Sequence, residues 1–341
     1  MASQVPSAEP SPDLILETMN AYQRTAALRA AIQLDVFTAI GEGIDAPAAI
    51  AKRCQATERG IRMLCDYLAI LGFLTKDGAR YALTPDSAAF LDRRSPACIA
   101  SAAGFLTLPE TVVAYNELAN TVRTGRPALA EGEGSISFEN PIWVEFARSM
   151  GALQTPISEW LAEAVGASAG KKSKVLDIAA GHGVFGIAIA RRNPNAEIYS
   201  QDWPRVLDVA MKNARAAGVE ARVHRMPGSA FEVEFGTGYD VALLTNFLHH
   251  YDPSTIETLL HKIRAALSPN GVVATLEFVP NEDRVTPRRA ASFCMMMLGM
   301  TPAGDSYTFS EYRRMFQNAG FSSNELLPVL PSGHSIILSR I

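Results

Sequence analysis

Three glycines and one carboxylate lie close together in the stretch KVLDIAAGHGVFG, residues 174–186. Gly181, Gly183 and Gly186 have the G-x-G-x-x-G spacing that is typical of a nucleotide-binding turn between a strand and a helix. Asp177 precedes this turn, and a carboxylate there would repel the pyrophosphate of a dinucleotide and attract a cation. S-adenosylmethionine carries a sulfonium and an ammonium group, so the stretch favours it as the cofactor. The alternatives are a nicotinamide dinucleotide, or a carboxylate that only caps the turn.

A second acid follows the next predicted strand, in YSQDWP. Asp202 can bind both hydroxyls of a ribose, and Trp203 can cover one face of an adenine. The segment MPGSAF, residues 226–231, follows the third predicted strand, where adenine edges would be recognised, although its Phe231 could equally belong to the core. Dinucleotide and methyl-donor sites both use an acid like Asp202. Unless it is an exposed loop residue, it therefore predicts an adenosine without deciding between the two cofactors.

Two adjacent histidines follow the fourth predicted strand, in LLTNFLHHYDP. Asp252 and Pro253 are residue types that begin helices, so His249 and His250 come at the carboxyl end of the strand. Open α/β sheets bind their ligands at this end. Glu277 ends the fifth predicted strand, and we expect its carboxylate at the same edge, where it can orient one ring nitrogen of His249.

A histidine in this place can act as a general base. A phenolic hydroxyl has a pKa near 10 and must lose its proton when its oxygen is methylated. A positioned imidazole accelerates such a step roughly 10²- to 10⁴-fold. The alternative for His249 is a buried structural histidine. We expect no metal, because adjacent residues such as His249, His250 and Asp252 rarely converge on one ion.

Alternating strands and helices position these residues. Strands are predicted at 174–179, 196–201, 221–226, 239–246 and 271–278, and helices at 183–193, 204–217 and 254–267. This alternation is typical of a parallel sheet with helices on both faces. Thr308 and Glu311 have the spacing of a capping box and predict a helix that runs to Ala319. The tail ELLPVLPSGHSIILSRI predicts a terminal hairpin.

The first hundred residues have a different pattern. Residues 1–12 are polar and proline-rich, and we expect them to be disordered. Helices are predicted within 14–40, from an N-cap at Asp45 to Cys54, and from Thr57 to Gly72, with two short strands around Asp77 and Gly78. Three helices and a hairpin form a winged-helix pattern. Residues 97–165 are predicted to be helical and to contain a loop at 125–135.

A winged helix raises the possibility of DNA binding. The third helix, TERGIRMLCDYLAILGF, is apolar almost all round, whereas a helix that reads the major groove needs polar residues on its outer face. A helix that is apolar all round is expected to be buried. The pattern therefore favours dimerisation over DNA recognition.

The composition of the chain argues against several other classes of protein. The chain has 341 residues, of which 48% are hydrophobic, and a net charge of -4. This length suggests two domains, and the absence of basic surplus argues against nucleic acid and anionic membranes as partners. The N-terminus does not have the pattern of a signal peptide, and no stretch is long and apolar enough to span a bilayer. Four scattered cysteines predict free thiols in a reducing cytoplasm.

Together these motifs give the chain a recognisable family pattern. It resembles the two-domain, class I S-adenosylmethionine-dependent O-methyltransferases of the caffeic-acid and hydroxyneurosporene type. The resemblance covers nearly the whole chain and includes the winged-helix region, VLDIAAGHG, QDWP, FLHHYDP, LSPNGVVATLE and YTFSEYRRMFQNAGF. The glycine motif belongs to a wider class, whereas the histidine segment combined with the N-terminal domain is much more specific.

The resemblance implies a role for each candidate residue. The cofactor would be bound by Asp177, Ala179, Gly181, Gly183, Asp202, Trp203, Ser229, Ala230, Phe231 and Asn246. His249 would be the catalytic base and Glu277 one of two acids that flank it. The substrate pocket would include Phe146, Met150, His250, Met296 and Met297, although methionines at helical spacing are also common in plain cores.

Three positions depart from the family pattern. Ser229 stands where an acid is usual, which weakens the contact expected on the adenine side. His250 stands where the family often has Asp. The second flanking Glu falls on Ser306, which leaves His249 with one acid fewer, or leaves the role to Asp305.

The resemblance implies an α/β protein in three parts after the disordered start. Residues 13–100 would form a winged-helix dimerisation domain, 101–170 a helical linker that contributes to the substrate pocket, and 171–341 a Rossmann-like catalytic domain. We expect a cytoplasmic homodimer that methylates a hydroxyl of a small aromatic or polyketide-like molecule. The alternatives are methylation of nitrogen or carbon, and a dimer that binds the cofactor without catalysis.

Overall fold

A computed structural model describes residues 10–129 and 133–341 of the chain. The predicted disorder of residues 1–12 and the predicted loop at 125–135 therefore lie partly outside the described residues. The chain divides into two compact units, one ending at Ala103 and the other beginning at Gly104. Each unit has a core of its own.

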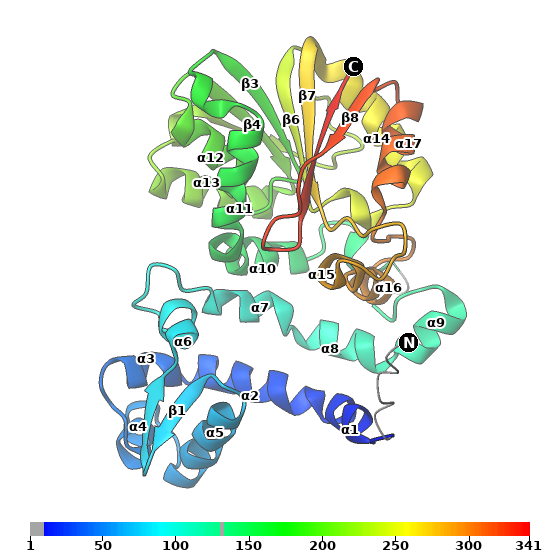
Figure 1. Cartoon of the computed structure of the whole chain (residues 1–341). Coiled ribbons are helices and arrows are strands. Elements are labelled where there is room, and N and C mark those ends of the chain that lie inside the picture. The colour runs from blue at the N-terminus through cyan, green and yellow to red at the C-terminus, as the bar shows by residue number, and fades with distance from the viewer. Residues whose placement is uncertain (1–9, 130–132) are drawn as a thin grey trace, which may run out of the picture. The chain divides into compact units, whose positions relative to one another are not determined.

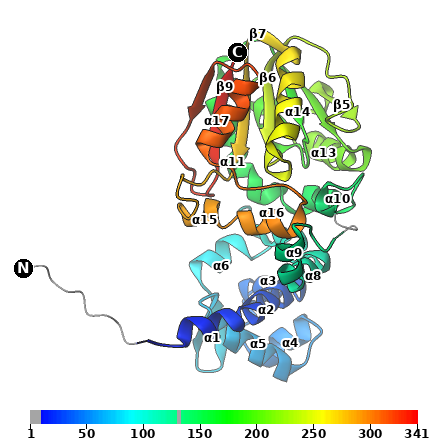
Figure 2. The same ribbon diagram turned by 90° about the vertical axis from the view of Figure 1, so that its right-hand side faces the viewer.

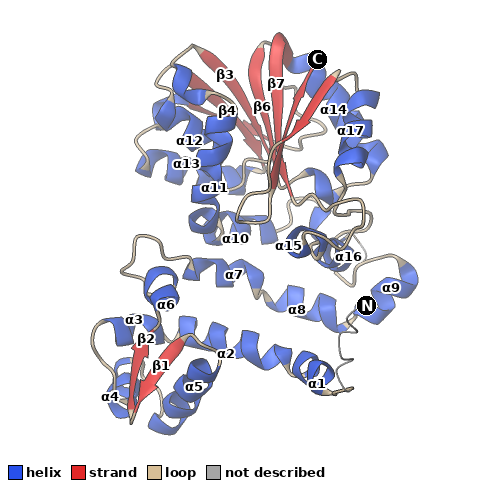
Figure 3. Cartoon of the chain, in the orientation of Figure 1, coloured by secondary structure: helices blue, strands red, loops and turns tan. Residues whose placement is uncertain are grey.

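The first unit is a winged helix (Figure 3). Its elements are α1 (Asp13–Met19), α2 (Ala21–Gln33), α3 (Val36–Gly41), α4 (Pro47–Arg53), α5 (Glu58–Ile70), β1 (Leu74–Asp77), β2 (Arg80–Leu83) and α6 (Pro85–Phe90). The predicted hairpin is confirmed, because β1 and β2 pair antiparallel around Gly78, which has a φ of 55°. Asp35 interrupts the first predicted helical stretch with a φ of 61°.

Two expectations for this unit are wrong. The N-cap of α4 is Ala46, and the Asp45 carboxylate instead accepts hydrogen bonds from Arg80 at 2.7 Å. Helix α5 is not buried all round, since Met63 is 47% exposed and Ile70 is 79% exposed. Only one face of α5 packs into the core of the unit, so none of the described residues covers its apolar side chains on the other face.

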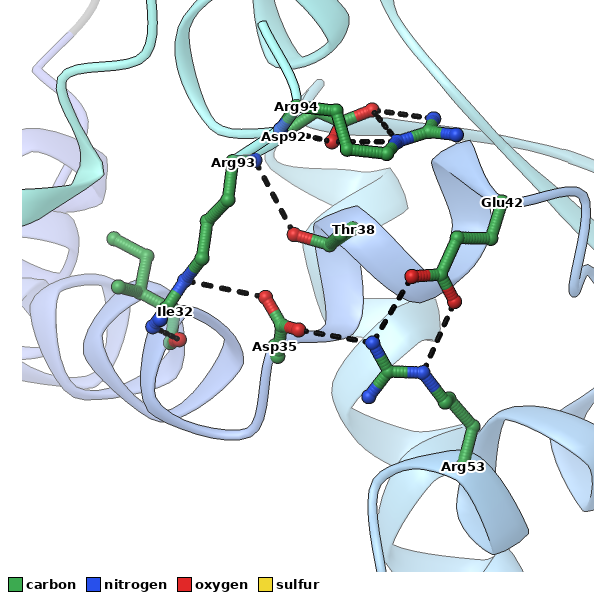
Figure 4. Close-up of polar contacts among 8 residues, drawn as sticks. All are labelled: Ile32, Asp35, Thr38, Glu42, Arg53, Asp92, Arg93 and Arg94. Atoms are coloured by element: carbon green, nitrogen blue, oxygen red, sulfur yellow. Dashed lines mark hydrogen bonds and ion pairs between the residues drawn. The ribbon is translucent and has the colours of Figure 1, made fainter.

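Ion pairs connect the start and the end of this unit (Figure 4). Arg53 pairs with both Asp35 and Glu42, at 3.1 and 3.0 Å. Arg93 pairs with Asp35 at 3.2 Å, and its backbone N–H donates to the Thr38 hydroxyl at 3.2 Å. Asp35 thus holds α4 and the segment after α6 against the turn between α2 and α3.

The second unit begins with helices and continues into one sheet. The helices are α7 (Ala103–Leu106), α8 (Pro109–Asn116), α9 (Leu118–Thr124), α10 (Ile142–Ser149) and α11 (Gly151–Ala164). The strands are β3 (Ser173–Ile178), β4 (Ala196–Asp202), β5 (Val223–Pro227), β6 (Tyr239–Thr245), β7 (Leu267–Glu277), β8 (Ser323–Leu326) and β9 (Ser335–Arg340). Within the described chain they lie in the order β5-β4-β3-β6-β7-β9-β8.

Helices cover both faces of this sheet (Figure 1). The remaining helices of the unit are α12 (Val184–Arg192), α13 (Pro204–Ala216), α14 (Pro253–Ala266), α15 (Arg288–Ala291), α16 (Cys294–Met300) and α17 (Phe309–Asn318). Of these, α15 and α16 lie beyond one end of the strands rather than on a face (Figure 1 and Figure 2). Helices α11, α12 and α13 pack on one face, and α14 and α17 pack on the other, where Figure 2 shows them in front of the sheet. Side chains alternate between the two cores, so Val175 lies with α12 and Leu176 lies with α14.

The predicted strands and helices are confirmed with small differences at their ends. Strand β7 begins at Leu267 rather than at residue 271, because Leu267 pairs with Tyr239 across a bulge. The capping box of Thr308 and Glu311 is present, and β8 and β9 form the terminal antiparallel pair. Strands β3 to β7 are parallel, whereas β9 runs antiparallel to β7. The beginning of β9 therefore lies at the edge where the parallel strands end.

Candidate active site

A cavity lies at this carboxyl edge, and we call it the edge cavity; its empty space of about 730 Å³ includes part that is open to solvent. All of its walls belong to the second unit. They consist of Ile136, Trp143, Phe146, Ala179, Gly181, Gln201, Asp202, Trp203, Val206, Gly228, Ser229, Ala230, Phe231, Thr245, Asn246, Phe247, His250 and Tyr251. The cavity opens where β3, β4, β5 and β6 end, which is the position that open α/β sheets give to their ligands.

The glycine turn has two distinct parts. Ala179 and Gly181 line the edge cavity with positive φ angles of 51° and 56°. A Cβ at Gly181 would approach the Phe146 ring to 3.3 Å, so glycine keeps that wall open. Gly183, expected to bind the cofactor, does not line the cavity. A Cβ there would meet Ala210 at 3.1 Å, and one at Gly186 would meet Ile198 at 2.6 Å, so these two glycines allow close packing of α12.

The Asp177 carboxylate does not line the edge cavity, which differs from the expectation that it binds the cofactor. Asp177 lies within β3 with no exposed surface. Side-chain alternation directs it to the face covered by α12, where a Cβ at Gly186 would be 2.8 Å from its Oδ2. Burial raises the pKa of Asp177 to about 7, and the Gly186 backbone offsets part of that rise. Burial therefore disfavours a negative charge on Asp177.

Asp202 is the carboxylate that lines the edge cavity. It ends β4 and is 8% exposed. The Gly181 N–H donates to its Oδ2 at 2.8 Å, and the Trp203 N–H donates to its Oδ1 at 2.7 Å. Burial raises the pKa of Asp202 to about 6, while these two N–H groups act in the opposite direction. The carboxylate retains lone pairs for the hydroxyls of a ribose, because each oxygen can accept more than one hydrogen bond.

Aromatic rings and small residues form the rest of the predicted nucleotide wall. Trp203, Ser229, Ala230 and Phe231 all line the edge cavity. The Ser229 hydroxyl accepts a hydrogen bond from the Phe231 N–H at 3.2 Å. The Phe231 ring makes an edge contact with Tyr251, with 5.1 Å between centroids. The structure thus brings these four predicted residues together, and it adds Tyr251 to them.

Gln201 is a cavity residue that the sequence motifs did not single out. It is 2% exposed and lies one position before Asp202. Its Oε1 accepts from the Ala179 N–H at 3.1 Å, and its Nε2 donates to the Gly228 carbonyl at 2.5 Å. The side chain therefore connects the loops that follow β3 and β5. The sequence did contain a signal for this role, because Gln201 is a polar residue in a buried strand, directly before the predicted ribose-binding Asp202.

The His249 ring is hydrogen-bonded to Glu277. His249 lies in a short 3-10 turn after β6, and its Nδ1 contacts Oε2 of Glu277 at the end of β7. The other carboxylate oxygen, Oε1, accepts from the N–H groups of Phe247 and Leu248 at 3.0 and 2.9 Å. Both partners are almost fully buried, at 4% and 0% exposure. The turn and the carboxylate together determine the orientation of the imidazole.

Burial moves both pKa values in this pair toward the neutral forms. It lowers the pKa of His249 to about 3 and raises the pKa of Glu277 to about 8. The backbone N–H groups of Phe247, Leu248 and His249 oppose the rise at Glu277. When Glu277 is ionised, it accepts the Nδ1–H of a neutral imidazole, which leaves the Nε2 lone pair of His249 available as a base.

The edge cavity reaches His250 and not His249. The two rings are tilted by 58° with 4.3 Å between centroids, so the His249 ring is in contact with a residue that lines the cavity. His250 is 7% exposed, and its Nδ1 is buried without a hydrogen-bond partner in residues 10–129 and 133–341. Trp143 packs edge-on against the His250 ring at 5.0 Å. The expected position of His250 beside a ligand is thus compatible with the geometry.

Neither Ser306 nor Asp305 replaces a second flanking acid. The Ser306 hydroxyl is buried and hydrogen-bonded to the carbonyls of Phe278 and Ala290. The Asp305 side chain is 41% exposed and pairs with Arg284 at 3.2 Å, so the alternative that gave the role to Asp305 is wrong. Only the Asp305 backbone N–H approaches His249, donating to its carbonyl at 3.0 Å.

Of the remaining residues predicted to bind the substrate, only one lines the edge cavity. Phe146 lines the edge cavity and stacks on His182 of the glycine turn at 5.6 Å. Met150, Met296 and Met297 do not line this cavity. Met150 and Met297 are buried, at 7% and 1% exposure. Their assignment to a substrate pocket stays a prediction.

Neither a metal-binding cluster nor a membrane-spanning helix occurs in the described residues. No three His, Cys, Asp or Glu side chains in residues 10–129 and 133–341 are arranged to hold a metal ion. In the same ranges, none of the helices has the length and apolar character needed to cross a bilayer.

The fold and the site define a class I methyltransferase, and comparison with known families agrees. Residues 115–322 match the O-methyltransferase domain, and residues 16–93 match the O-methyltransferase dimerisation domain. The chain therefore belongs to the O-methyltransferase family, whose members use S-adenosylmethionine as methyl donor.

Individual relatives extend over nearly the whole chain. A crystal structure from Nostoc punctiforme, provisionally assigned as an O-methyltransferase, is 48% identical, covers 97% of this chain and 99% of its own, and has a TM-score of 0.92. The 3-hydroxy-5-methyl-1-naphthoate 3-O-methyltransferase of Streptomyces sahachiroi is 27% identical, with coverage of 94% and 92%. Human N-acetylserotonin methyltransferase, solved with S-adenosylmethionine, is 22% identical, covers 99% of both chains and shares the fold with a TM-score of 0.85.

Proposed function

We propose that this protein transfers the methyl group of S-adenosylmethionine to a hydroxyl of a small aromatic or polyketide-like molecule, with His249 as the general base. The observation that carries the proposal is the hydrogen bond between His249 Nδ1 and Glu277 at the carboxyl edge of the sheet. It pairs a potential base with a buried carboxylate that determines its tautomer. Membership of the family supports methyl transfer as the reaction, and the hydrogen-bonded pair of His249 and Glu277 supports the choice of residues for proton removal.

The residues of the edge cavity fit the cofactor. When bound, S-adenosylmethionine supplies an electrophilic methyl group and leaves as S-adenosylhomocysteine. Asp202 would hold the ribose hydroxyls, since its carboxylate lines the cavity and has free lone pairs. Ala179 and Gly181 would form the floor beside the methionine moiety, and Gln201 keeps their loop in place.

The apolar walls near His250 support the proposed acceptor class. Trp143 and Phe146 line the cavity there and contact each other edge-on at 5.8 Å. Flat aromatic molecules pack well against such rings. The relative from Streptomyces sahachiroi acts on a hydroxynaphthoate, which is an acceptor of this kind.

His249 would accept the hydroxyl proton of the acceptor at Nε2. Its Nδ1 is held by Glu277, so only Nε2 is available for this role. The low pKa of the buried imidazole keeps it unprotonated before the step. The carboxylate of Glu277 then stabilises the imidazolium that forms.

We also propose that the protein is a homodimer through its first unit. The match to the dimerisation domain supports this arrangement. The exposed apolar side chains of Met63 and Ile70 on α5 also support it, because a partner subunit would cover them.

The base assignment is tested by separating the two histidines. We first identify an acceptor with labelled methyl donor and a panel of phenols, flavonoids, polyketides and amines. The His249→Ala substitution is then expected to lower kcat by about 10²- to 10⁴-fold, with little change in the affinity for S-adenosylhomocysteine. The matched control, His250→Ala, should mainly raise the KM of the acceptor, because His250 lines the cavity but has no carboxylate partner among the described residues.

The reverse result would exchange the two roles. If His250→Ala abolished turnover while His249→Ala retained it, the base would be His250 and the Glu277 pair would be structural. If the panel gave methylation only of nitrogen or carbon, the acceptor class would be wrong.

A further inference from the structure

A fourth histidine, far away in sequence, lies close to this site. His334 immediately precedes β9 and is 4% exposed. Ser335 pairs with Glu277 in the sheet, and this register places His334 beside the end of β7. His334 also reaches across to the end of β6, where its Nε2 is 3.0 Å from Oδ1 of Asn246. The contact joins residues 88 positions apart.

The hydrogen bonds of His334 are consistent with a single neutral tautomer. The Asn246 oxygen can only accept, so His334 Nε2 carries the proton. The Ser332 hydroxyl is 3.0 Å from Nδ1 and donates to it. Burial, His249 and Arg289 all lower the pKa of His334, to about 3, which agrees with a neutral ring.

Asn246 is a cavity residue with an unusual backbone. It lines the edge cavity and has a φ of 53°, and its N–H donates to the Leu276 carbonyl at 2.8 Å. Asparagine tolerates this left-handed region better than most residues. With Oδ1 committed to His334, the side-chain NH₂ group is what Asn246 can offer to a ligand as a donor.

A series of aromatic ring contacts connects the His334 side chain to His249. The Phe278 ring lies 3.9 Å from His334 and 4.3 Å from Phe293, and Phe293 contacts His249 edge-on at 4.8 Å. The hairpin therefore touches the site at two places. One is the Asn246 amide at the cavity wall, and the other is this series of rings.

We propose that His334 is a positioning residue that orients the Asn246 amide, so that its NH₂ group donates to an acceptor atom of the bound cofactor. The proposal rests on the proposed function only in that the edge cavity holds S-adenosylmethionine. It gives the terminal hairpin a part in cofactor binding.

The test measures the dissociation constant of S-adenosylhomocysteine by calorimetry, together with the melting temperature. His334→Phe retains a ring against Phe278 and removes the hydrogen bond, and we expect about 3- to 10-fold weaker binding with little change in melting temperature. His334→Gln offers an N–H at similar reach and should restore most of the affinity. Asn246→Gly, which tolerates the positive φ, should weaken binding at least as much.

The double variant decides whether the two residues act together. If His334 acts through Asn246, adding His334→Phe to Asn246→Gly should cause no further loss of affinity. Additive losses, or wild-type affinity in His334→Phe, would overturn the proposal. Because calorimetry needs no methyl acceptor, these results stand apart from any failure of the predicted methylation or of His249 as its base.

Discussion

At the scale of single residues, the proposed role of His249 as a base depends on the ionisation of Glu277. The pair offers a free Nε2 lone pair only when Glu277 has lost its proton, because a protonated carboxyl would itself donate to the ring. Burial raises the pKa of Glu277 to about 8. The low pKa of His249 means that the imidazole does not limit activity at higher pH.

This coupling predicts a rise of kcat with pH. The fraction of ionised Glu277 increases as pH rises through about 8, so we expect kcat under saturating conditions to increase across that region. The measurement is a pH–rate profile with two acceptors whose hydroxyl pKa values differ. A rise that follows the enzyme should stay at the same pH for both acceptors.

The Glu277→Gln variant is the control for that profile. An amide has one acceptor oxygen, whereas Glu277 now accepts from His249 and two backbone N–H groups. We expect the variant to be slower and to lose the rise near pH 8. If the pH at which kcat rises changed with the pKa of the acceptor hydroxyl, the rise would instead reflect ionisation of the substrate.

At the scale of elements, the first unit depends on close contact between the end of α3 and the segment after α6. Gly41 is the last residue of α3, and a Cβ there would lie 2.2 Å from Oδ2 of Asp92 and 2.4 Å from Nη2 of Arg94. Asp92 is 6% exposed and pairs with Arg94 at 2.7 Å. A methyl group at Gly41 therefore cannot be added without moving this pair.

We expect Gly41→Ala to lower the free energy of unfolding by about 1–3 kcal/mol, from overpacking. Helix propensity alone would favour alanine by about 1 kcal/mol, so the sign of the change tells which effect is larger. The measurement is urea denaturation followed by circular dichroism.

The Asp92→Ala background provides the control, because it removes the carboxylate that the new methyl group would meet. There, the same Gly41→Ala change should be neutral or stabilising. If Gly41→Ala stabilised the wild-type protein, the contact at this helix end would be less tight than it is in the structure.

At the scale of the whole molecule, helix α1 has apolar side chains that residues 10–129 and 133–341 leave uncovered. It has no buried residue, and Leu16 and Met19 are 52% and 70% exposed. Both residues lie within the match to the dimerisation domain. Exposed apolar side chains that gather on one element commonly mark an interface.

We therefore expect sedimentation equilibrium to give twice the 36.8 kDa mass of one chain. Changing Leu16 and Met19 together to Asp should shift the protein toward one chain, since charges would have to be buried at the interface. Val329→Asp, at an exposed apolar position of the second unit, should leave the mass unchanged. A monomeric wild-type protein, or a double variant that remained dimeric, would contradict this use of α1.

Local sequence patterns predicted most of the fold. The strands and helices of the second unit lie within a few residues of their expected positions, and the capping box at Thr308 is present. The cavity position of Asp202 and the pairing of His249 with Glu277 also agree with what the motifs suggested. These features follow from spacing along one segment, or from the rule that parallel strands end at one edge.

Local patterns along the chain were therefore enough to predict the order of the elements and the edge of the sheet at which the site lies. Three features became visible only in the folded chain: Asp177 lies against α12, Asp305 pairs with Arg284, and His334 contacts Asn246. The physical reason is that a short pattern specifies local backbone geometry, whereas the surroundings of a side chain depend on register and on packing between segments far apart in the chain.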